Sequence, residues 1–316
     1  MLKIGYRYTA NRMAMVARQD GAMAGAIAGI EFVASELGKL PRLITMLITR
    51  GPNAVLAKHR APINVEMISR SLARIGVEPK DYCVDVSGFR QHVARGFYPD
   101  NYAAGPMLEG GAREQKLLEY YVSLDFLDAD AASVVIDVAS EWSLFPEVLH
   151  TLTGATVYQQ DLIYRPGIHG TRIGGSAAAM PVPDSFADAL VLHNAFEHFE
   201  GTADTDFIRE AWRVLKPGGR LCILPLFMAN EHVILTDPLS NRRGIVFDPG
   251  ARIIEATWVH NRFGRFYDAA ALKRRVLDPA HAAGFEATIY RITNLREVHP
   301  RVYLQFFLVL RKPTTS

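Results

Sequence analysis

The spacing of apolar residues divides the chain near residue 130. Before that point they recur mainly three or four positions apart, which is typical of helices that bury one face. The expected elements are helices over 24–40, 65–75 and 113–127, an apolar stretch over 40–49, a strand or turn around 82–86, and a loop over 96–111. We therefore predict a mainly helical N-terminal region over 1–110, serving as a lid, a dimer contact or a surface contact.

After residue 130, short β-branched runs alternate with helical stretches. The expected strands are 134–138, 155–158, 171–173, 189–192, 220–224, 285–292 and 302–310, with helices up to 152, over 205–215 and over 269–283. Strands separated by helices favour a mostly parallel sheet with helices on both faces. The short connection before the last strand predicts that this strand is antiparallel.

Composition excludes some classes of protein. Of the 316 residues, 49% are hydrophobic and 22% charged, which supports a sizeable core and argues against extended disorder. The net charge of +2 gives no reason to expect a nucleic-acid partner. Residues 1–80 carry a net +7, however, so the front of the chain is basic. This basic region is either a solvated face or a surface that meets phosphates or an anionic membrane.

Cysteine usage and the apolar runs bear on location. Cys83 and Cys222 lie far apart, so we expect neither a disulfide framework nor a zinc site built on cysteine. Free thiols suit a reducing cytoplasm. The first residues lack the apolar core of a signal peptide, and charges or proline interrupt every long apolar stretch. We therefore expect a cytoplasmic protein with no membrane-spanning segment.

Two local patterns stand out in the second half. Arg213–Leu221 combines a helix end, a proline and two glycines with the start of a core strand. Ala177–Asp188 is a proline-containing loop that leads into an apolar strand, and the polar cluster His193–His198 follows that strand. Ligands of open α/β sheets bind at the carboxyl ends of strands, so we expect the site there.

In this order and spacing, the two patterns resemble the class I S-adenosylmethionine-dependent methyltransferases, in particular the type 11 group. Arg213–Gly219 matches the family's arginine–valine–leucine–lysine–proline–glycine–glycine signature, and Phe196–His198 resembles its leucine–glutamate–histidine step. The resemblance implies a Rossmann-like α/β sheet of seven strands in the order 3-2-1-4-5-7-6. It also implies a catalytic domain over 111–316, with an insertion at about 228–268 that covers the substrate.

The family's glycine-rich turn is altered in this chain. Asp137 provides the acidic residue expected in the first strand, but Ala139, Glu141 and Ser143 stand where the resemblance implies glycines. Glycine serves at such positions because the backbone approaches the ligand closely and bends sharply. Glu141 adds bulk and a negative charge, which faces the cofactor's sulfonium, points to solvent or fills the site.

The resemblance also implies the other contacts to the cofactor. Asp161 follows Asp137 by 24 residues, where a carboxylate would accept hydrogen bonds from the ribose hydroxyls; capping of the next turn is the alternative. Ser176 replaces an acidic contact to the adenine amine. The residues expected to hold S-adenosylmethionine are Asp137, Ala139, Ser140, Glu141, Asp161, Leu162, Ser176, Ala177, His193 and Asn194.

Methyl transfer to oxygen or nitrogen needs close positioning and sometimes a general base. His198 is the first candidate base and His193 the second; a structural hydrogen-bonding role is the alternative for both. The residues expected to contact the substrate are His232, His260, Arg262, Arg265 and Tyr267. Aromatic rings with arginines suit a sugar or an anionic small molecule, whereas self-packing of the insertion is the other interpretation.

These patterns define the expected function. We expect a methyltransferase acting on an oxygen or nitrogen of a small molecule, either a saccharide or a natural-product intermediate. The alternative is a pseudo-enzyme or repurposed enzyme that keeps the fold. We expect no metal, because His232, Asp237, His260 and Asp268 lack the close histidine spacing of metal sites. The apolar and basic stretch 40–60 indicates burial, a homodimer contact or peripheral membrane contact.

Overall fold

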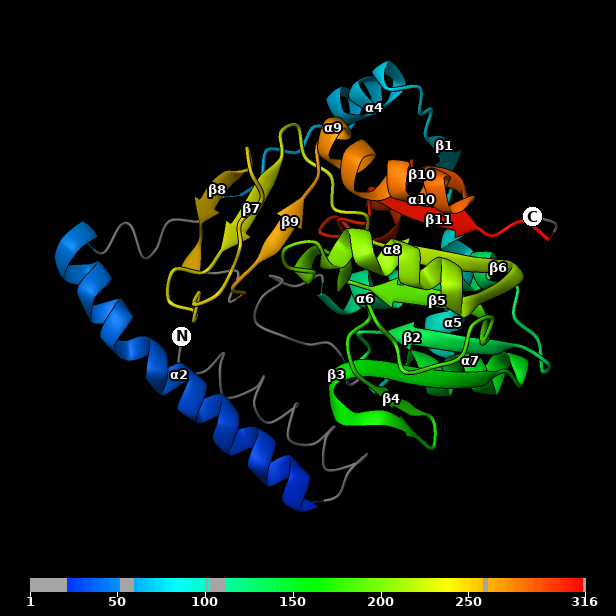
Figure 1. Ribbon diagram of the computed structural model, residues 1–316, viewed down its shortest axis with the longest axis horizontal. Helices are drawn as coiled ribbons and strands as arrows, with labels where there is room; N and C mark the ends of the chain where they lie inside the picture. Colours follow the sequence, from blue (N-terminus) through cyan, green and yellow to red (C-terminus); the bar gives the residue numbers. More distant parts are fainter. Residues whose placement is uncertain are drawn as a thin grey trace.

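The computed structural model describes residues 22–51, 60–99, 102, 112–141, 143–257 and 261–314. Its large sheet comprises β1 (Lys80–Tyr82), β2 (Val134–Val138), β3 (Thr156–His169), β4 (Arg172–Gly174), β5 (Ala187–His193), β6 (Leu215–Leu224), β10 (Glu286–Ile292) and β11 (Phe306–Arg311). A second sheet comprises β7 (Val233–Thr236), β8 (Arg252–Glu255) and β9 (Gly264–Phe266). Figure 1 shows the two sheets side by side.

The helices are α2 (Ala22–Arg50), α4 (Val65–Arg74), α5 (Val86–Ala94), α6 (Ala112–Leu127), α7 (Phe145–Thr153), α8 (Ala203–Val214), α9 (Ala269–Leu272), α10 (Asp278–Ala283) and α11 (Leu295–Val298). A 3-10 turn spans Phe196–His198, and a π-helical segment spans Lys273–Leu277. No helix in the described ranges is both long and apolar enough to cross a bilayer.

The order of strands in the large sheet is β1-β10-β11-β6-β5-β2-β3-β4. Strand β11 runs antiparallel to both of its neighbours, while β5 runs parallel to β2 and β6. The Rossmann-like class is thereby confirmed, and the seven expected strands lie in the expected order. The expected strand count was wrong by one, because β1 from the N-terminal region pairs with β10, Lys80 lying opposite Tyr290.

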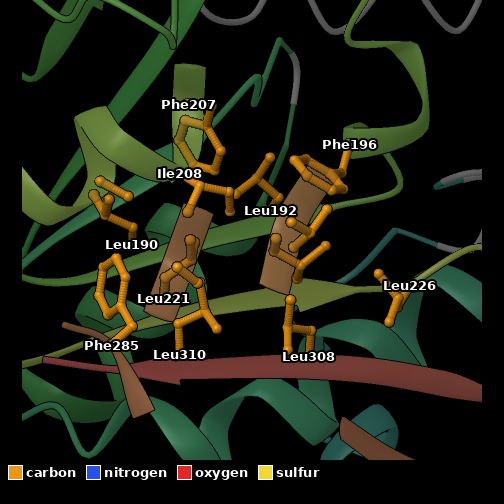
Figure 2. Packing of buried hydrophobic residues seen from close by; sticks show 14 of the residues in the cluster. Leu190, Leu192, Phe196, Phe207, Ile208, Leu221, Leu226, Phe285, Leu308 and Leu310 are labelled. Carbon is orange, nitrogen blue, oxygen red and sulfur yellow. The ribbon is translucent and has the colours of Figure 1, made fainter. Parts of the chain in front are cut away.

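Alternate residues of the central strands enter two separate cores. In β5, Leu190 and Leu192 face one core, whereas Ala189 and Val191 face the other. The first core lies under α8, α10 and α4, and Figure 2 shows its leucines and phenylalanines. The second lies under α5, α6 and α7. Because both faces are covered, the ends of the strands remain as the place where a ligand reaches the sheet.

The two patterns that carried the resemblance hold each other in place. Arg213 pairs with Asp184 at 2.7 Å, and Lys216 pairs with Asp188 at 2.7 Å. The expected turn at 216–219 is instead an irregular part of β6. There Gly218 has φ 84°, and a Cβ on Gly219 would lie 2.8 Å from the Lys216 carbonyl oxygen. These residues stabilise the fold.

The N-terminal region differs in two ways from what the sequence predicted. The helix expected over 24–40 and the apolar stretch over 40–49 form one helix, α2, which continues through Pro41. The loop expected over 96–111 lies mostly outside the described residues. The division of the chain at residue 110 stays a prediction, although β1 belongs to the large sheet.

Candidate functional site

Two buried side chains meet where β2 and β5 end side by side. Asp137 Oδ1 lies 3.4 Å from His193 Nδ1, and Asp137 Oδ2 accepts no hydrogen bond from the described residues. His193 is enclosed by the rings of Tyr120 and Phe145, and its Nε2 lies 3.1 Å from Ser123 Oγ. Burial lowers the pKa of His193. A neutral, enclosed His193 suits a positioning role better than proton transfer to a substrate.

The turn after β2 contains two residues with positive φ angles, although neither is glycine. Ala139 and Glu141 have φ values of 52° and 40°, in the left-handed region that side chains usually avoid. Two side chains from β3 hold their amides. Ala139 N donates to Gln160 Oε1 at 3.2 Å, and Glu141 N donates to Asp161 Oδ2 at 2.9 Å. Two of the three positions where the resemblance implies glycine therefore have a left-handed backbone, although neither residue is glycine.

The rest of the turn closes on itself. Ser143 N donates to the Ser140 carbonyl at 2.7 Å, and Ser140 N donates to the Gln160 carbonyl at 3.0 Å. At the third position expected to be glycine, Ser143 Oγ lies 3.0 Å from the hydroxyl of Tyr120. Trp142 lies outside the described residues. Hydrogen bonds made by Ser140 and Ser143 thus hold the bend of the turn in place.

Strand β3 presents the other residues expected to hold the cofactor. Asp161 Oδ1 accepts from the amide of Ile163 at 3.1 Å, in addition to the bond from Glu141, and burial raises the pKa of Asp161. Leu162 is 75% exposed beside it. At the end of β4, Ser176 is exposed and Ala177 is buried. An apolar side chain and a carboxylate therefore stand together at this edge of the sheet.

His198 lies on the same edge, in the turn after β5. Its Nδ1 lies 2.7 Å from the carbonyl of Phe263, so Nδ1 carries the proton and donates it, and Nε2 is left as an acceptor. Glu197 Oε1 lies 3.4 Å from Nε2, and Asn261 Nδ2 lies 3.5 Å from it. The His198 side chain is 38% exposed. Of the two candidate bases, only His198 meets solvent to this extent.

Helix α6 carries a buried polar group that was not expected from the sequence. Lys116 Nζ donates to the His193 carbonyl at 2.7 Å and lies 3.4 Å from Glu119 Oε2, while Gln115 Nε2 donates to Glu119 Oε1 at 2.8 Å. Burial raises the pKa of Glu119 to about 7. The Tyr303 amide donates to Gln115 Oε1 at 2.7 Å, which connects the segment before β11 to the site.

A signal for this group was present in the sequence. The segment 113–127 has apolar residues on every side, and such helices are usually covered all round. A charged residue in a fully covered helix needs partners in the interior, which directs attention to Glu119. We call the residues Asp137, His193, Asn194, Glu197, His198, Asp161, Lys116 and Glu119 the Asp137 edge.

Three residues expected to bind substrate lie in a separate buried group. Arg265 is fully buried and contacts Asp248 at 2.6 Å and Asp204 at 3.1 Å. Tyr267 donates to Asp204 at 2.8 Å, and His232 Nε2 lies 3.0 Å from Asp248 Oδ2. A substrate would have to break these pairs to reach Arg265 or Tyr267. The structure therefore gives them a role in joining the small sheet to α8.

The remaining expected substrate residues differ in position. Arg262 is partly exposed and pairs with Glu200, Nε lying 2.7 Å from Oε1. His260 lies outside the described residues. Within the described part of the chain, no three His, Cys, Asp or Glu side chains gather as metal ligands would. Arg262 and Glu200 thus form a polar rim beside Asn261 and His198.

Comparison with known proteins supports the fold. The family model described as a methyltransferase domain matches residues 147–223, from α7 to the end of β6. The match begins just after the altered turn at 139–143. No curated protein sequence matches the chain.

Solved structures of methyltransferases are similar at low identity. The 1,6-didemethyltoxoflavin-N1-methyltransferase of Burkholderia thailandensis, bound to 1,6-didemethyltoxoflavin and S-adenosylhomocysteine, shares 14% identity at a TM-score of 0.44, covering 81% of this chain and 94% of that one. Geranyl diphosphate C-methyltransferase of Streptomyces coelicolor shares 14% at a TM-score of 0.42, covering 68% and 86%. The overlaps are loose and carry no argument, so the assignment of the fold depends on the strand order and on the family-model match over residues 147–223.

Proposed function

We propose that this chain, which carries a class I methyltransferase domain, transfers a methyl group from S-adenosylmethionine to an oxygen or nitrogen of a small molecule. One observation carries the proposal. Three non-glycine residues, Ala139, Glu141 and Asn194, hold positive φ angles at the adjoining ends of β2 and β5. Strained backbone persists where the surrounding structure enforces it, and it gathers at binding sites. These enforced backbone angles support the proposal that the cofactor binds at this turn.

The residues present fit the cofactor. Asp137 is 1% exposed, and its Oδ2 is a buried acceptor with no partner among the described residues, so it suits a donor group of a ligand. Each oxygen of Asp161 accepts one amide, which leaves a second lone pair on each for the ribose hydroxyls. The exposed Leu162 offers an apolar surface for the adenine ring. Ser176 and Ala177 remain proposed contacts at the adenine edge.

The chemistry of this chain's own residues centres on His198. S-adenosylmethionine supplies, when bound, a methyl carbon attached to a cationic sulfur. The Phe263 carbonyl fixes the His198 ring with the proton on Nδ1, so Nε2 is the atom that would accept a proton from the acceptor oxygen or nitrogen. Glu197, 3.4 Å away, would stabilise the imidazolium that results.

The substrate we propose is a polar small molecule, a saccharide or a natural-product intermediate. Arg262, Glu200 and Asn261 form a polar, partly exposed rim next to His198. Convergent amide, carboxylate and guanidinium groups suit a ligand rich in hydroxyls. We also propose the cytoplasm as the location, because Cys83 is an exposed free thiol.

Calorimetric titration with S-adenosylmethionine and S-adenosylhomocysteine tests the proposal. We expect binding of both ligands, and loss of methyl transfer but not of binding in His198→Ala. The matched control is His281→Ala on α10, another exposed histidine. Absence of heat with either ligand at high micromolar concentration would contradict the assignment of the cofactor.

A second candidate function is a pseudo-enzyme that binds without transferring methyl groups. It is favoured by the amide bonds that already engage both oxygens of Asp161, and by the hydrogen bond from the Tyr164 hydroxyl to the Glu141 carbonyl, which ties the turn to β3. A triple variant with glycine at 139, 141 and 143 separates the two functions. If only this variant binds S-adenosylmethionine, the native chain is not a methyltransferase.

A further inference from the structure

A groove runs between the last part of α2 and the loop 238–243 that follows β7. Its volume is about 520 Å³, within the range of roughly 300–1,000 Å³ that small-molecule sites occupy. One wall is α2 over residues 41–50, and the other is the loop together with Glu255 at the end of β8. Figure 1 shows α2 as the long blue helix, and Met46 of this helix packs against Leu239 of the loop. The groove therefore lies where the basic N-terminal region meets the small sheet.

Four arginines line this groove, and they face a single carboxylate. Arg42 and Arg50 come from α2, whereas Arg242 and Arg243 come from the loop. Among the described residues of the lining, only Glu255 is acidic, so the four guanidinium charges and one carboxylate leave a net charge of +3. A cleft lined by one sign of charge attracts ions of the opposite sign. We call these five residues the arginine groove.

Two of the four guanidinium groups share one partner. Arg50 pairs with Glu255 Oε2, and Arg242 Nη1 lies 2.8 Å from Glu255 Oε1. Burial alone would raise the pKa of Glu255, but the hydrogen bonds from Arg50 and Arg242 outweigh burial and lower it. Glu255 is therefore ionised, and its single charge balances only one of the two arginines.

The other two guanidinium groups have donors to spare. Arg42 Nη1 donates to the Leu239 carbonyl at 3.0 Å, which uses one of the five N–H groups of its side chain. The exposed side chain of Arg243 makes no hydrogen bond or ion pair with a residue that the structure describes. Both arginines can therefore bind an anion without first breaking an ion pair.

Backbone contacts fix the loop that presents Arg243. The amide of Arg243 donates to Asn241 Oδ1 at 3.1 Å, and the amide of Ser240 donates to the Asp237 carbonyl at 3.0 Å. Ser240 Oγ also donates to Asp237 Oδ2 at 3.2 Å. A loop held in this way loses little conformational entropy when a ligand binds.

The same loop connects the arginine groove to the polar rim beside His198. Arg262 Nη2 donates to the Arg243 carbonyl at 3.4 Å, and the Asp237 amide donates to the Asn261 carbonyl at 2.7 Å. Asn261 and Arg262 are two of the rim residues. One extended ligand could therefore contact the groove and the rim together.

We propose that the arginine groove binds the phosphate or diphosphate group of a ligand. Guanidinium groups bind phosphate oxygens through paired hydrogen bonds, and a net charge of +3 suits an anion with several charges better than a single carboxylate. Binding of the anion does not depend on methyl transfer. That the phosphate-bearing molecule is also the methyl acceptor rests on the proposed function.

Calorimetric titration of the full chain with inorganic pyrophosphate tests the groove, in a buffer without S-adenosylmethionine or divalent cations. We expect saturable binding of one pyrophosphate per chain and no binding of acetate at the same concentration. The double variant Arg42→Ala with Arg243→Ala should bind pyrophosphate at least tenfold more weakly. The control Arg70→Ala with Arg209→Ala removes the same charge from exposed positions on α4 and α8, and it should keep the wild-type affinity.

Three results would overturn the proposal. These are the absence of saturable heat with millimolar pyrophosphate, an equal loss of affinity in the two double variants, and equal binding of acetate and pyrophosphate. Thermal melting checks that the variants are folded. If the double variant melts early, Arg243→Ala alone decides the question, because it removes no side-chain pairing among the described residues and should still weaken binding.

Sedimentation with vesicles distinguishes the two sources of a phosphate group. Wild-type protein that sediments with phosphatidylcholine vesicles containing phosphatidic acid, while the Arg42→Ala and Arg243→Ala double variant does not, identifies a lipid headgroup. Pyrophosphate binding without sedimentation identifies a soluble phosphorylated molecule. A chain that binds pyrophosphate but not S-adenosylmethionine keeps the groove and contradicts the proposed function, whereas the reverse result contradicts only the groove.

Discussion

Two buried polar regions of this molecule contain candidate site residues, and they differ in how well their charges are partnered. The Arg265 cluster (Asp204, His232, Asp248, Arg265, Tyr267 and Arg275) joins two carboxylates to two guanidinium groups by ion pairs of 2.6 to 3.6 Å. At the Asp137 edge, Asp137 and Glu197 each keep one buried oxygen without a hydrogen bond from the described residues. Fully paired charges stabilise a fold, whereas buried acceptors without partners beside strained backbone are more typical of functional sites.

The pKa values of one carboxyl in each region show the same contrast. Burial alone would raise the pKa of both carboxyl groups, Asp248 and Glu119. At Asp248, hydrogen bonds from His232 and Arg265 outweigh burial and hold the pKa well below its usual range. At Glu119, Lys116 and Gln115 offset burial only in part, so the pKa stays raised, at about 7. The partners of Asp248 therefore compensate fully for the burial of its charge, whereas the partners of Glu119 compensate only in part.

The largest expected effect breaks the Arg265 cluster. Arg265→Ala leaves Asp248 and Asp204 buried with fewer partners, and we expect a loss of roughly 3–5 kcal/mol in the free energy of unfolding, measured in urea. Arg262→Ala is the control, because it removes a partly exposed pair with Glu200 and should cost less than about 1 kcal/mol. If Arg265→Ala is as stable as the wild type and loses only substrate binding, Arg265 is a substrate-binding residue and not a structural one.

The second prediction concerns Glu119 at the Asp137 edge. Its usual pKa of 4.5 is raised to about 7 in the folded protein, so the folded state holds this proton more tightly than the unfolded state. Wild-type stability therefore falls as the pH rises from about 4.5 to 7. Glu119→Gln removes this dependence. We expect its gain over wild type to grow with pH to roughly 3 kcal/mol at pH 8, measured by urea unfolding at pH 5 and pH 8.

The control for Glu119→Gln is Glu147→Gln on α7. Glu147 is exposed, so its substitution should change stability little at either pH. If the gain of Glu119→Gln is the same at pH 5 and pH 8, the proton is not bound to Glu119 in the folded state.

The sequence predicted the fold well because its signals are local. Alternating strands and helices, with Val134–Val138 as the first core strand, required only patterning that neighbouring residues express. Strand β1 was expected only as a strand or turn around 82–86. Its place in the large sheet was not predicted, because three residues, Lys80–Tyr82, carry no periodicity and are fixed by pairing with β10, over 200 residues away. The long helix α2 was divided in the prediction because Pro41 usually ends a helix.

The site was harder to predict because it depends on which residues, distant in the sequence, pair with one another in the folded protein. Arg265 and Tyr267 look like ligand-binding residues in sequence, yet Asp204 and Asp248 from distant segments occupy them. Ala139 and Glu141 replace expected glycines, yet hydrogen bonds to side chains of β3 hold a left-handed backbone at both positions. Neither the pairing of Arg265 and Tyr267 nor the support of the turn by β3 can be inferred from one segment of the sequence.

A third prediction tests whether the Asp137 edge holds the cofactor. Asp161→Asn removes the charge of the proposed ribose acceptor, and we expect at least a tenfold weaker affinity for S-adenosylhomocysteine by calorimetry, equivalent to about 1.4 kcal/mol. Asp128→Asn is the control, since Asp128 is an exposed turn residue with φ 50° that asparagine tolerates. Equal affinities in the two variants would remove Asp161 from the cofactor site.

The smallest effect, and the most direct test of strain at this edge, is Glu141→Gly. With φ at 40°, Glu141 occupies a backbone region that costs a side chain roughly 1–2 kcal/mol, and glycine avoids this cost while losing more entropy on folding. We expect a net gain of about 0.5–1 kcal/mol in urea unfolding. Ser140→Gly, at a neighbouring position without a positive φ, should lose stability for the same entropic reason. If Glu141→Gly also loses stability, the Glu141 side chain stabilises the turn by more than its backbone strain, and the Asp137 edge is a scaffold like the Arg265 cluster.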